Sequence, residues 1–223
     1  PIFCIKSWIK IKSNMKDIES KLKKISPNVF YSTHHEAHHY YSFYTSNFEE
    51  SSCLAIDGVG EIDTMSLGIG DYSGIKYTSL SEYPHSLGLF YTALTSYLGF
   101  RPNEGEYKMM GLASYGNYEK YLKDVRKLIQ FKNGKLTCNM DVFCWDKSDK
   151  TMFNEKLSQL LPVTQRLPEE KITKEHEDLA ASVQKVYEEI LFSVLKMIGI
   201  ISKNQNLCLS GGCATTVQQT VKS

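Results

Sequence analysis

Two neighbouring stretches decide the fold: Thr33-His34-His35-Glu36-Ala37-His38-His39 and Cys53-Leu54-Ala55-Ile56-Asp57-Gly58-Val59-Gly60-Glu61. Four of the chain's six histidines lie in the first stretch, which continues without Pro or Gly to Tyr44 and therefore predicts a helix. The second stretch opens with a short apolar run that predicts a strand. A glycine directly after Asp57 lets the chain turn sharply at the end of that strand.

The spacing of the histidines indicates a metal site. Residues four apart share one face of a helix, which gives two pairs, His34 with His38 and His35 with His39. Either pair can offer two imidazole nitrogens to one divalent metal. Asp57, at the end of the predicted strand, is the expected third ligand. The alternative is that the histidines are packed and hydrogen-bonded in an aromatic core, or form a solvated surface cluster.

The composition is that of an ordinary globular protein. The chain has 223 residues, of which 42% are hydrophobic and 23% charged, so it can form one large domain or two small lobes. The net charge of +1 argues against a nucleic-acid or membrane-surface partner. No stretch approaches the roughly 20 apolar residues of a membrane span. The six cysteines form no CxxC pair, so we expect free thiols in the reducing cytoplasm.

The pattern along the chain predicts an α/β fold. A surface helix is expected over residues 14–24, followed by a short strand at residues 29–31 that leads into the histidine helix. Further expected elements are an antiparallel meander of strands 51–56, 64–70 and 75–80, a helix from 86 to 99, a hairpin around residues 133–134, an amphipathic helix 175–198 and a strand 206–209.

Two glycine-rich segments are candidate binding sites. In residues 101–116, Glu106 and Lys108 lie among glycines, where a backbone can approach a ligand, although a solvated turn is the alternative. At residues 206–216 a strand, a Gly-Gly turn and a helix start form an anion cradle. His85, near another helix start, has either a supporting role beside the metal or substrate or a capping or packing role.

Read together, these motifs resemble the N-terminal domain of the O-carbamoyltransferases, the family that includes nodulation protein U and the cephalosporin and tobramycin carbamoyltransferases. The resemblance covers about residues 30–220. The matching segments are His34-His35-Glu36-Ala37-His38, Phe48-Glu49-Glu50, Asp57-Gly58-Val59-Gly60-Glu61, Pro84-His85-Ser86-Leu87-Gly88, Gly105-Glu106-Tyr107-Lys108-Met109-Met110-Gly111-Leu112-Ala113, Asp178-Leu179-Ala180-Ala181-Ser182-Val183-Gln184 and Leu207-Cys208-Leu209-Ser210-Gly211-Gly212.

The resemblance implies the actin-like ATPase fold of sugar kinases and heat-shock ATPases, which the tRNA threonylcarbamoyl transferases share. Residues 1–223 are then one N-terminal carbamoyltransferase domain, incomplete at both ends, whose second lobe begins near residue 175. The chain starts at Pro1 without a methionine and stops at Ser223 just after an expected helix start, as a piece of a longer protein would. An adenylate-forming domain and a fourth metal ligand, an aspartate, are expected beyond it.

The resemblance also selects site residues. It implies that His34, His38 and Asp57 bind iron or zinc. The residues expected to contact the nucleotide, ATP or carbamoyl-adenylate, are Gly58, Gly60, Ser210, Gly211 and Gly212. The residues expected to be catalytic are His35, His39, Glu106 and Lys108, of which the two histidines act either as the base for the acceptor hydroxyl or as support for the metal ligands. One departure from the family is Ala214-Thr215-Thr216, where Ala-Leu-Asn is usual.

The implied reaction transfers a carbamoyl group from carbamoyl-adenylate, made from carbamoyl phosphate and ATP, to a hydroxyl of a small acceptor. The sequence names neither the acceptor nor the metal, and it leaves a homodimer open. One alternative is a tRNA threonylcarbamoyl-transferase-like enzyme, which the near-zero net charge argues against. The other alternative is a non-catalytic nucleotide-binding fragment.

Overall fold

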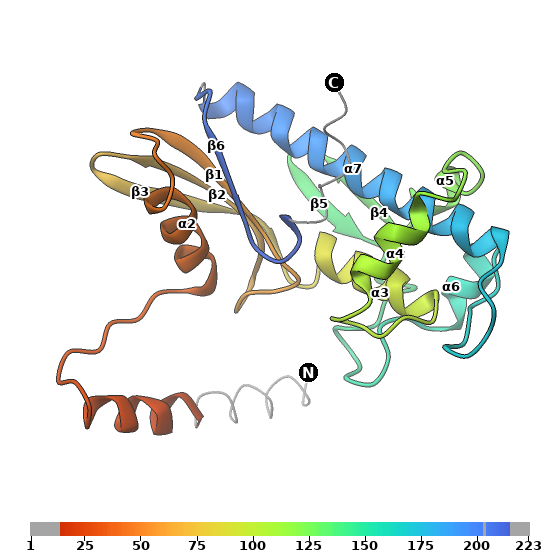
Figure 1. Ribbon diagram of the computed structural model, residues 1–223, viewed down its shortest axis with the longest axis horizontal. Coiled ribbons are helices and arrows are strands. Elements are labelled where there is room, and N and C mark those ends of the chain that lie inside the picture. The colour runs from red at the N-terminus through yellow and green to blue at the C-terminus, as the bar shows by residue number, and fades with distance from the viewer. Residues whose placement is uncertain (1–13, 203, 215–223) are drawn as a thin grey trace.

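The protein has a mixed α/β fold built on a four-stranded sheet, as a computed structural model covering residues 14–202 and 204–214 shows (Figure 1). The strands are β1 (Ser51–Ile56), β2 (Asp63–Asp71), β3 (Gly74–Glu82) and β6 (Leu207–Ser210), in the order β3-β2-β1-β6. Strands β1 to β3 form an antiparallel meander, and β6 is parallel to β1. The predicted meander and α/β class are confirmed.

Helices and a small hairpin complete the described structure. The elements are α2 (His34–Tyr44), α3 (Leu87–Tyr97), α4 (Glu106–Ala113), α5 (Leu122–Val125), β4 (Ile129–Lys132), β5 (Lys135–Cys138), α6 (Glu155–Leu160) and α7 (Lys174–Ser202). The hairpin turns at Asn133 and Gly134, which have φ angles of 52° and 76°. Positive φ at both residues is what a tight two-residue turn requires, so the predicted hairpin is confirmed.

The two faces of the sheet are covered by different helices. Alternate side chains of a strand point to opposite faces. On one face, Leu54 and Ile56 join the main core with residues of α3 and α7. On the other face, Cys53 packs with Phe43 of α2 and with Cys208. All six residues of β1 are buried, which explains why its sequence is a continuous run of small and apolar residues.

Helix α2 begins where the sequence predicts, at a capping box. The backbone N–H of Glu36 donates to the Thr33 hydroxyl, and the backbone N–H of Thr33 donates to the Glu36 carboxylate. The Thr33 hydroxyl also lies 2.9 Å from the hydroxyl of Tyr77 on β3. The first turn of α2 is therefore attached to the sheet.

A line of small residues on β2 lets α2 lie close to the sheet. Ser66, Gly68 and Gly70 alternate along the strand and face the helix. A Cβ atom on Gly68 would lie 2.9 Å from the His39 ring, and one on Gly70 would lie 2.8 Å from the Phe43 ring. Both distances are too short for any larger residue, so the helix register depends on these glycines.

Of the two elements predicted in the N-terminal region, the structure confirms the helix and contradicts the strand. Residues 14–23 are helical as predicted, but the apolar residues Ile18, Leu22 and Ile25 are exposed, and Figure 1 shows this helix apart from the sheet. The strand predicted at residues 29–31 is wrong: this segment has no regular structure, and Phe30 is 91% exposed. A strand needs a hydrogen-bonded neighbour, and in the described part of the chain none pairs with it.

At the other end, α7 extends beyond the predicted helix by one residue at its start and four at its end. Its buried residues share one core with the sheet and α3, and the division into lobes near residue 175 stays a prediction.

The helix expected from residue 213 onward falls largely in residues 215–223, outside the described residues. Within the part of the chain that is described, no helix combines the length and apolar character needed to cross a membrane.

We predict that Gly70→Ala lowers the free energy of unfolding by roughly 1–3 kcal/mol, because the new methyl group overlaps the Phe43 ring. Gly199 on α7 is the matched control, since a Cβ there meets nothing within 4 Å. Gly199→Ala should stabilise the protein by up to about 1 kcal/mol through helix propensity. Urea unfolding measures both, and equal effects of the two changes would contradict the close packing of α2.

Candidate metal centre

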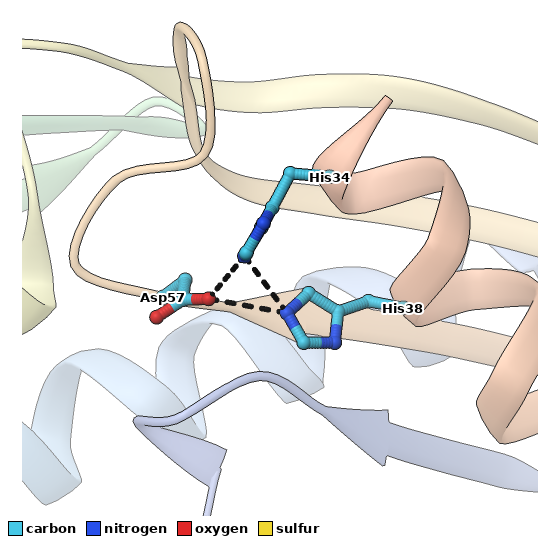
Figure 2. A group of neighbouring side chains, drawn as sticks. All are labelled: His34, His38 and Asp57. Atoms are coloured by element: carbon cyan, nitrogen blue, oxygen red, sulfur yellow. Dashed lines mark hydrogen bonds and ion pairs between the residues drawn. The ribbon is translucent and has the colours of Figure 1, made fainter. Parts of the chain in front are cut away.

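His34, His38 and Asp57 converge on one point (Figure 2). The Asp57 Oδ2 atom lies 2.7 Å from His34 Nε2 and 3.1 Å from His38 Nε2, and the two nitrogens are 3.1 Å apart. Of the two histidine pairs that the spacing allowed, the structure therefore brings the pair His34 and His38 to Asp57.

Two elements position these three side chains. The histidines are one turn apart on α2, and Asp57 directly follows β1, whose central place in the sheet holds its end rigidly. The backbone N–H of Gly58 donates to Asp57 Oδ1 at 2.8 Å, which leaves Oδ2 for the histidines. The side chains of His34, His38 and Asp57 are 44%, 27% and 23% exposed, so a small ligand can reach them.

The charge state of Asp57 suits a cation. Burial by itself disfavours the ionised carboxylate, but the hydrogen bonds with His34, Gly58 and His38 outweigh it and hold the pKa of Asp57 below its ordinary value. Asp57 is therefore an anion at neutral pH, next to two imidazole nitrogens.

The donor set fits a divalent metal. Two imidazole nitrogens and one carboxylate oxygen form a ligand set that zinc and ferrous iron accept, with positions left open for a substrate. Ligand atoms bound tetrahedrally at about 2.0–2.1 Å from zinc lie roughly 3.3 Å from each other. The observed separations of 2.7–3.1 Å need only a small expansion to admit such an ion.

The turn after Asp57 also holds the helix. The backbone N–H of His34 donates to the Glu61 carboxylate at 3.0 Å. Gly60 lies against the His34 ring, where a Cβ would come within 2.7 Å of it. The structure thus places Gly58 beside Asp57 and Gly60 beside His34. The contact of Glu61 was missed in the sequence, because a backbone partner 27 residues away leaves no local pattern.

The inner histidines, His35 and His39, have a different environment. They are 1% and 0% exposed, and both contact the Ser66 hydroxyl, at 2.6 Å from His35 Nδ1 and 2.8 Å from His39 Nε2. Burial lowers the pKa of both rings, and that of His39 falls to about 4. A substrate cannot reach these rings unless α2 moves, so their placement favours support over a role as base.

The Gly-Gly turn lies directly beside Asp57. Gly211 has a φ of 91°, and a Cβ there would lie 2.1 Å from the Ile56 carbonyl oxygen, so only glycine fits. A Cβ on Gly212 would lie 3.3 Å from Asp57 Oδ1. Ser210, the last residue of β6, pairs with Ala55 of β1. The turn therefore lies in the same site as His34, His38 and Asp57, which we call the triad.

A cavity of about 650 Å³ extends from this turn toward α4. Its lining residues are Arg101, Asn103, Glu104, Gly105, Glu106, Tyr107, Lys108, Met110 and Gly212. The Glu106 carboxylate accepts hydrogen bonds from the Thr92 hydroxyl at 2.8 Å and the Asn103 N–H at 2.9 Å. The structure brings Glu106 and Lys108 to the same cavity as Gly212.

Comparison of the sequence with models of known protein families identifies the family of this chain. Residues 2–222 match the family model described as the carbamoyltransferase N-terminus. The chain belongs to the carbamoyltransferase family.

Similar proteins occur in bacteria. This carbamoyltransferase chain is 35% identical to an uncharacterised protein of Synechocystis sp. over 96% of its length. It is 33% identical to nodulation protein NolO of Bradyrhizobium diazoefficiens over 81% of its length, and 32% identical to nodulation protein NolNO of Sinorhizobium fredii over 82%. It spans 36%, 31% and 25% of these relatives, respectively, so about a third of their length or less.

Two further residues lie in the surroundings of the candidate site. His85 has a packing role: its Nδ1 atom accepts from the Cys138 N–H at 3.2 Å and joins α3 to the hairpin. Cys213 follows the Gly-Gly turn and was not predicted. Burial raises the pKa of its thiol to about 12, with the nearby charges of Asp57 and Glu106 adding to the effect. It remains a neutral thiol that packs against the main core beside Gly88 of α3.

We predict that acid destabilises this carbamoyltransferase chain through His39. The folded-state pKa of about 4 lies below the ordinary 6.5, so the unfolded chain takes up a proton first as the pH falls. This contribution to stability is complete above pH 6.5 and declines by about 3 kcal/mol as the pH drops toward 4. Urea unfolding in the presence of a chelator, between pH 7.5 and 4.5, measures it.

The control for this prediction is His39→Gln, which has no titrating ring. Its stability at pH 7.5 should be lower, but the loss between pH 6.5 and 4.5 should be smaller than in the unmodified chain. An identical pH dependence in both proteins would contradict the assignment.

Proposed function

We propose that this chain is the metal- and nucleotide-binding part of an O-carbamoyltransferase, which transfers a carbamoyl group from carbamoyl-adenylate to a hydroxyl of a small molecule. The observation that carries the proposal is the convergence of His34, His38 and Asp57 within 3.1 Å, next to Gly212 at the edge of a cavity of about 650 Å³. Membership of the carbamoyltransferase family supports the reaction class.

In this proposal His34, His38 and Asp57 hold iron or zinc. Such an ion would supply Lewis-acid catalysis and hold the phosphate and the acceptor hydroxyl close together. The protein contributes the fixed ligands: Asp57 is ionised and neutralises part of the ion's charge. The partial exposure of all three side chains leaves room for the reacting groups.

The Gly-Gly turn and α4 are the proposed nucleotide site. Because Gly212 has no side chain beside Asp57, a phosphate can approach the triad from the cavity. Lys108 lines that cavity and supplies a positive charge for the phosphate. Glu106 is held by Thr92 and Asn103, so it is an oriented acceptor for a ligand hydroxyl or amide.

His35 and His39 have a supporting role in this proposal, because both rings are buried under α2.

We also infer the actin-like arrangement, which is supported by the antiparallel meander β1 to β3 with β6 added parallel to β1. The chain spans 36%, 31% and 25% of the three relatives compared above. Synthesis of carbamoyl-adenylate from carbamoyl phosphate and ATP is therefore proposed for the whole protein, in the cytoplasm, where the free thiols of the described residues are stable.

We predict that the purified chain binds about one equivalent of zinc or iron and that His38→Ala removes it, because two ligands hold a divalent ion far more weakly than three. His176→Gln is the control, since His176 caps α7 through Thr173 and is not part of the triad. Metal analysis of dialysed protein gives the answer. Equal metal content in wild type and His38→Ala would overturn the proposed metal centre.

We predict that Lys108→Ala weakens ATP binding about tenfold, because a cation facing the phosphates is lost from the cavity. Lys132→Ala, at the hairpin turn and outside this cavity, should leave the affinity unchanged. Isothermal titration with ATP measures both variants. Tight binding of tRNA by the wild-type chain would instead favour the threonylcarbamoyl-transferase alternative.

A further inference from the structure

One buried hydroxyl contacts both inner histidines. Ser66 Oγ lies 2.6 Å from His35 Nδ1 and 2.8 Å from His39 Nε2, and all three side chains are at most 1% exposed. A serine hydroxyl carries one hydrogen and can donate it to only one of these nitrogens. At least one of the two rings must therefore donate its own N–H to Ser66. This requirement links the tautomers and orientations of two residues one turn apart on α2.

Ser66 belongs to the same strand ladder as the metal-centre aspartate. On β2 it is the register partner of Ala55 on β1, two residues before Asp57. The backbone N–H of Asp57 continues the ladder by donating to the Thr64 carbonyl oxygen at 3.0 Å. The distance from Ser66 to Asp57 is thus set by paired backbone. A contact that fixes α2 to Ser66 also fixes α2 relative to Asp57.

The close packing at Gly68 and Gly70 limits how near α2 can lie to the sheet. The remaining contacts between α2 and the sheet do not set the rotation of the helix as directly. Phe43 and Cys53 make an apolar contact, which has no preferred direction. Glu61 and Tyr77 bind the exposed first turn, at the backbone of His34 and the side chain of Thr33. Ser66 instead makes directional hydrogen bonds to two buried side chains, His35 in the first turn of α2 and His39 in the next turn.

We propose that Ser66 is a positioning residue of the metal centre. Through His35 and His39, Ser66 sets the rotation of α2 about its axis and its distance from the sheet, so that His34 and His38 reach Asp57. His34 and His38 each precede one of the inner histidines by one residue, which corresponds to a rotation of about 100° around the helix axis. Each ligand is therefore next in the chain to a residue that Ser66 holds. This inference rests on the metal centre proposed above.

Nothing else among the described residues holds the two inner rings by a hydrogen bond. Their remaining nitrogens, His35 Nε2 and His39 Nδ1, are buried and have no hydrogen-bond partner in that part of the chain. Loss of the Ser66 hydroxyl leaves both rings without a polar contact. They can then turn, and the helix that carries the ligands becomes less constrained.

The test is the zinc affinity of Ser66→Ala, measured by competition with a chromophoric chelator. We expect roughly tenfold weaker binding, at the lower end of the effect of removing groups that orient metal ligands. The control is Ser182→Ala, which removes another fully buried serine hydroxyl, one bonded to the Tyr118 and Asp178 carbonyl oxygens, and should leave the affinity unchanged.

Two spectroscopic readouts separate positioning from simple loss of stability. The visible spectrum of the cobalt-loaded protein reports ligand geometry, and it should change in Ser66→Ala but not in Ser182→Ala. Long-range proton–nitrogen NMR spectra of the metal-free chain should show one fixed tautomer for each of His35 and His39 in wild type. In Ser66→Ala they should show a mixture of tautomers.

The outcomes distinguish this inference from the proposed function. If wild type binds no zinc, or if His38→Ala binds it equally well, the metal centre itself is overturned. If wild type binds zinc through His38 while Ser66→Ala keeps the same affinity and cobalt spectrum, the positioning role is overturned. Should Ser66→Ala not fold, Ser66→Cys replaces it, because a thiol of similar size is a weak hydrogen-bond donor. Wild-type affinity in Ser66→Cys would then overturn the role.

Discussion

The contact between α2 and the β1–β2 pair is the constraint on which the rest of the site depends. The helix lies on a strand face made of Ser66, Gly68 and Gly70, and the short distances at the two glycines leave no space for side chains. Strand β1 is buried on both faces in the centre of the sheet, so its end is rigid. Because the two elements meet closely, residues 34 and 57 come within hydrogen-bonding distance although 22 residues separate them.

The same region combines rigidity with access. The inner faces of α2 and the sheet are closed, while the three side chains lie at the rim, with His34 exposed and His38 and Asp57 partly buried. Glycines occur where the backbone must pass close to the triad, at Gly60 beside His34 and at Gly212 beside Asp57. The triad is therefore accessible and lies near a cavity, although the helix and strands that hold it are tightly packed. This separation suits a centre that has to bind an ion and still admit a substrate.

Much of the fold and part of the site could be predicted from the sequence, because the signals are local. The absence of Pro and Gly after His34 marked a helix, and turn residues between strand candidates marked the meander and the hairpin at Asn133-Gly134. The strand expected at residues 29–31 was wrong, since β-branched and aromatic residues indicate a strand only where a partner strand is available. Glu61, Ser66 and Cys213 were missed, because each acts through a partner distant in the chain.

By itself the sequence determined that two histidine pairs lie on one helix and that an aspartate follows a buried strand. Helical and strand periodicity are properties of the local backbone, and they need no tertiary information. The spacing alone left open which pair faces the aspartate; the family resemblance implied His34 and His38, and the tertiary structure decided it by burying the other pair against Ser66. The physical reason is that both pairs satisfy the helical period equally well. The rotation of a helix about its axis is set by what it packs against, here the small residues of β2.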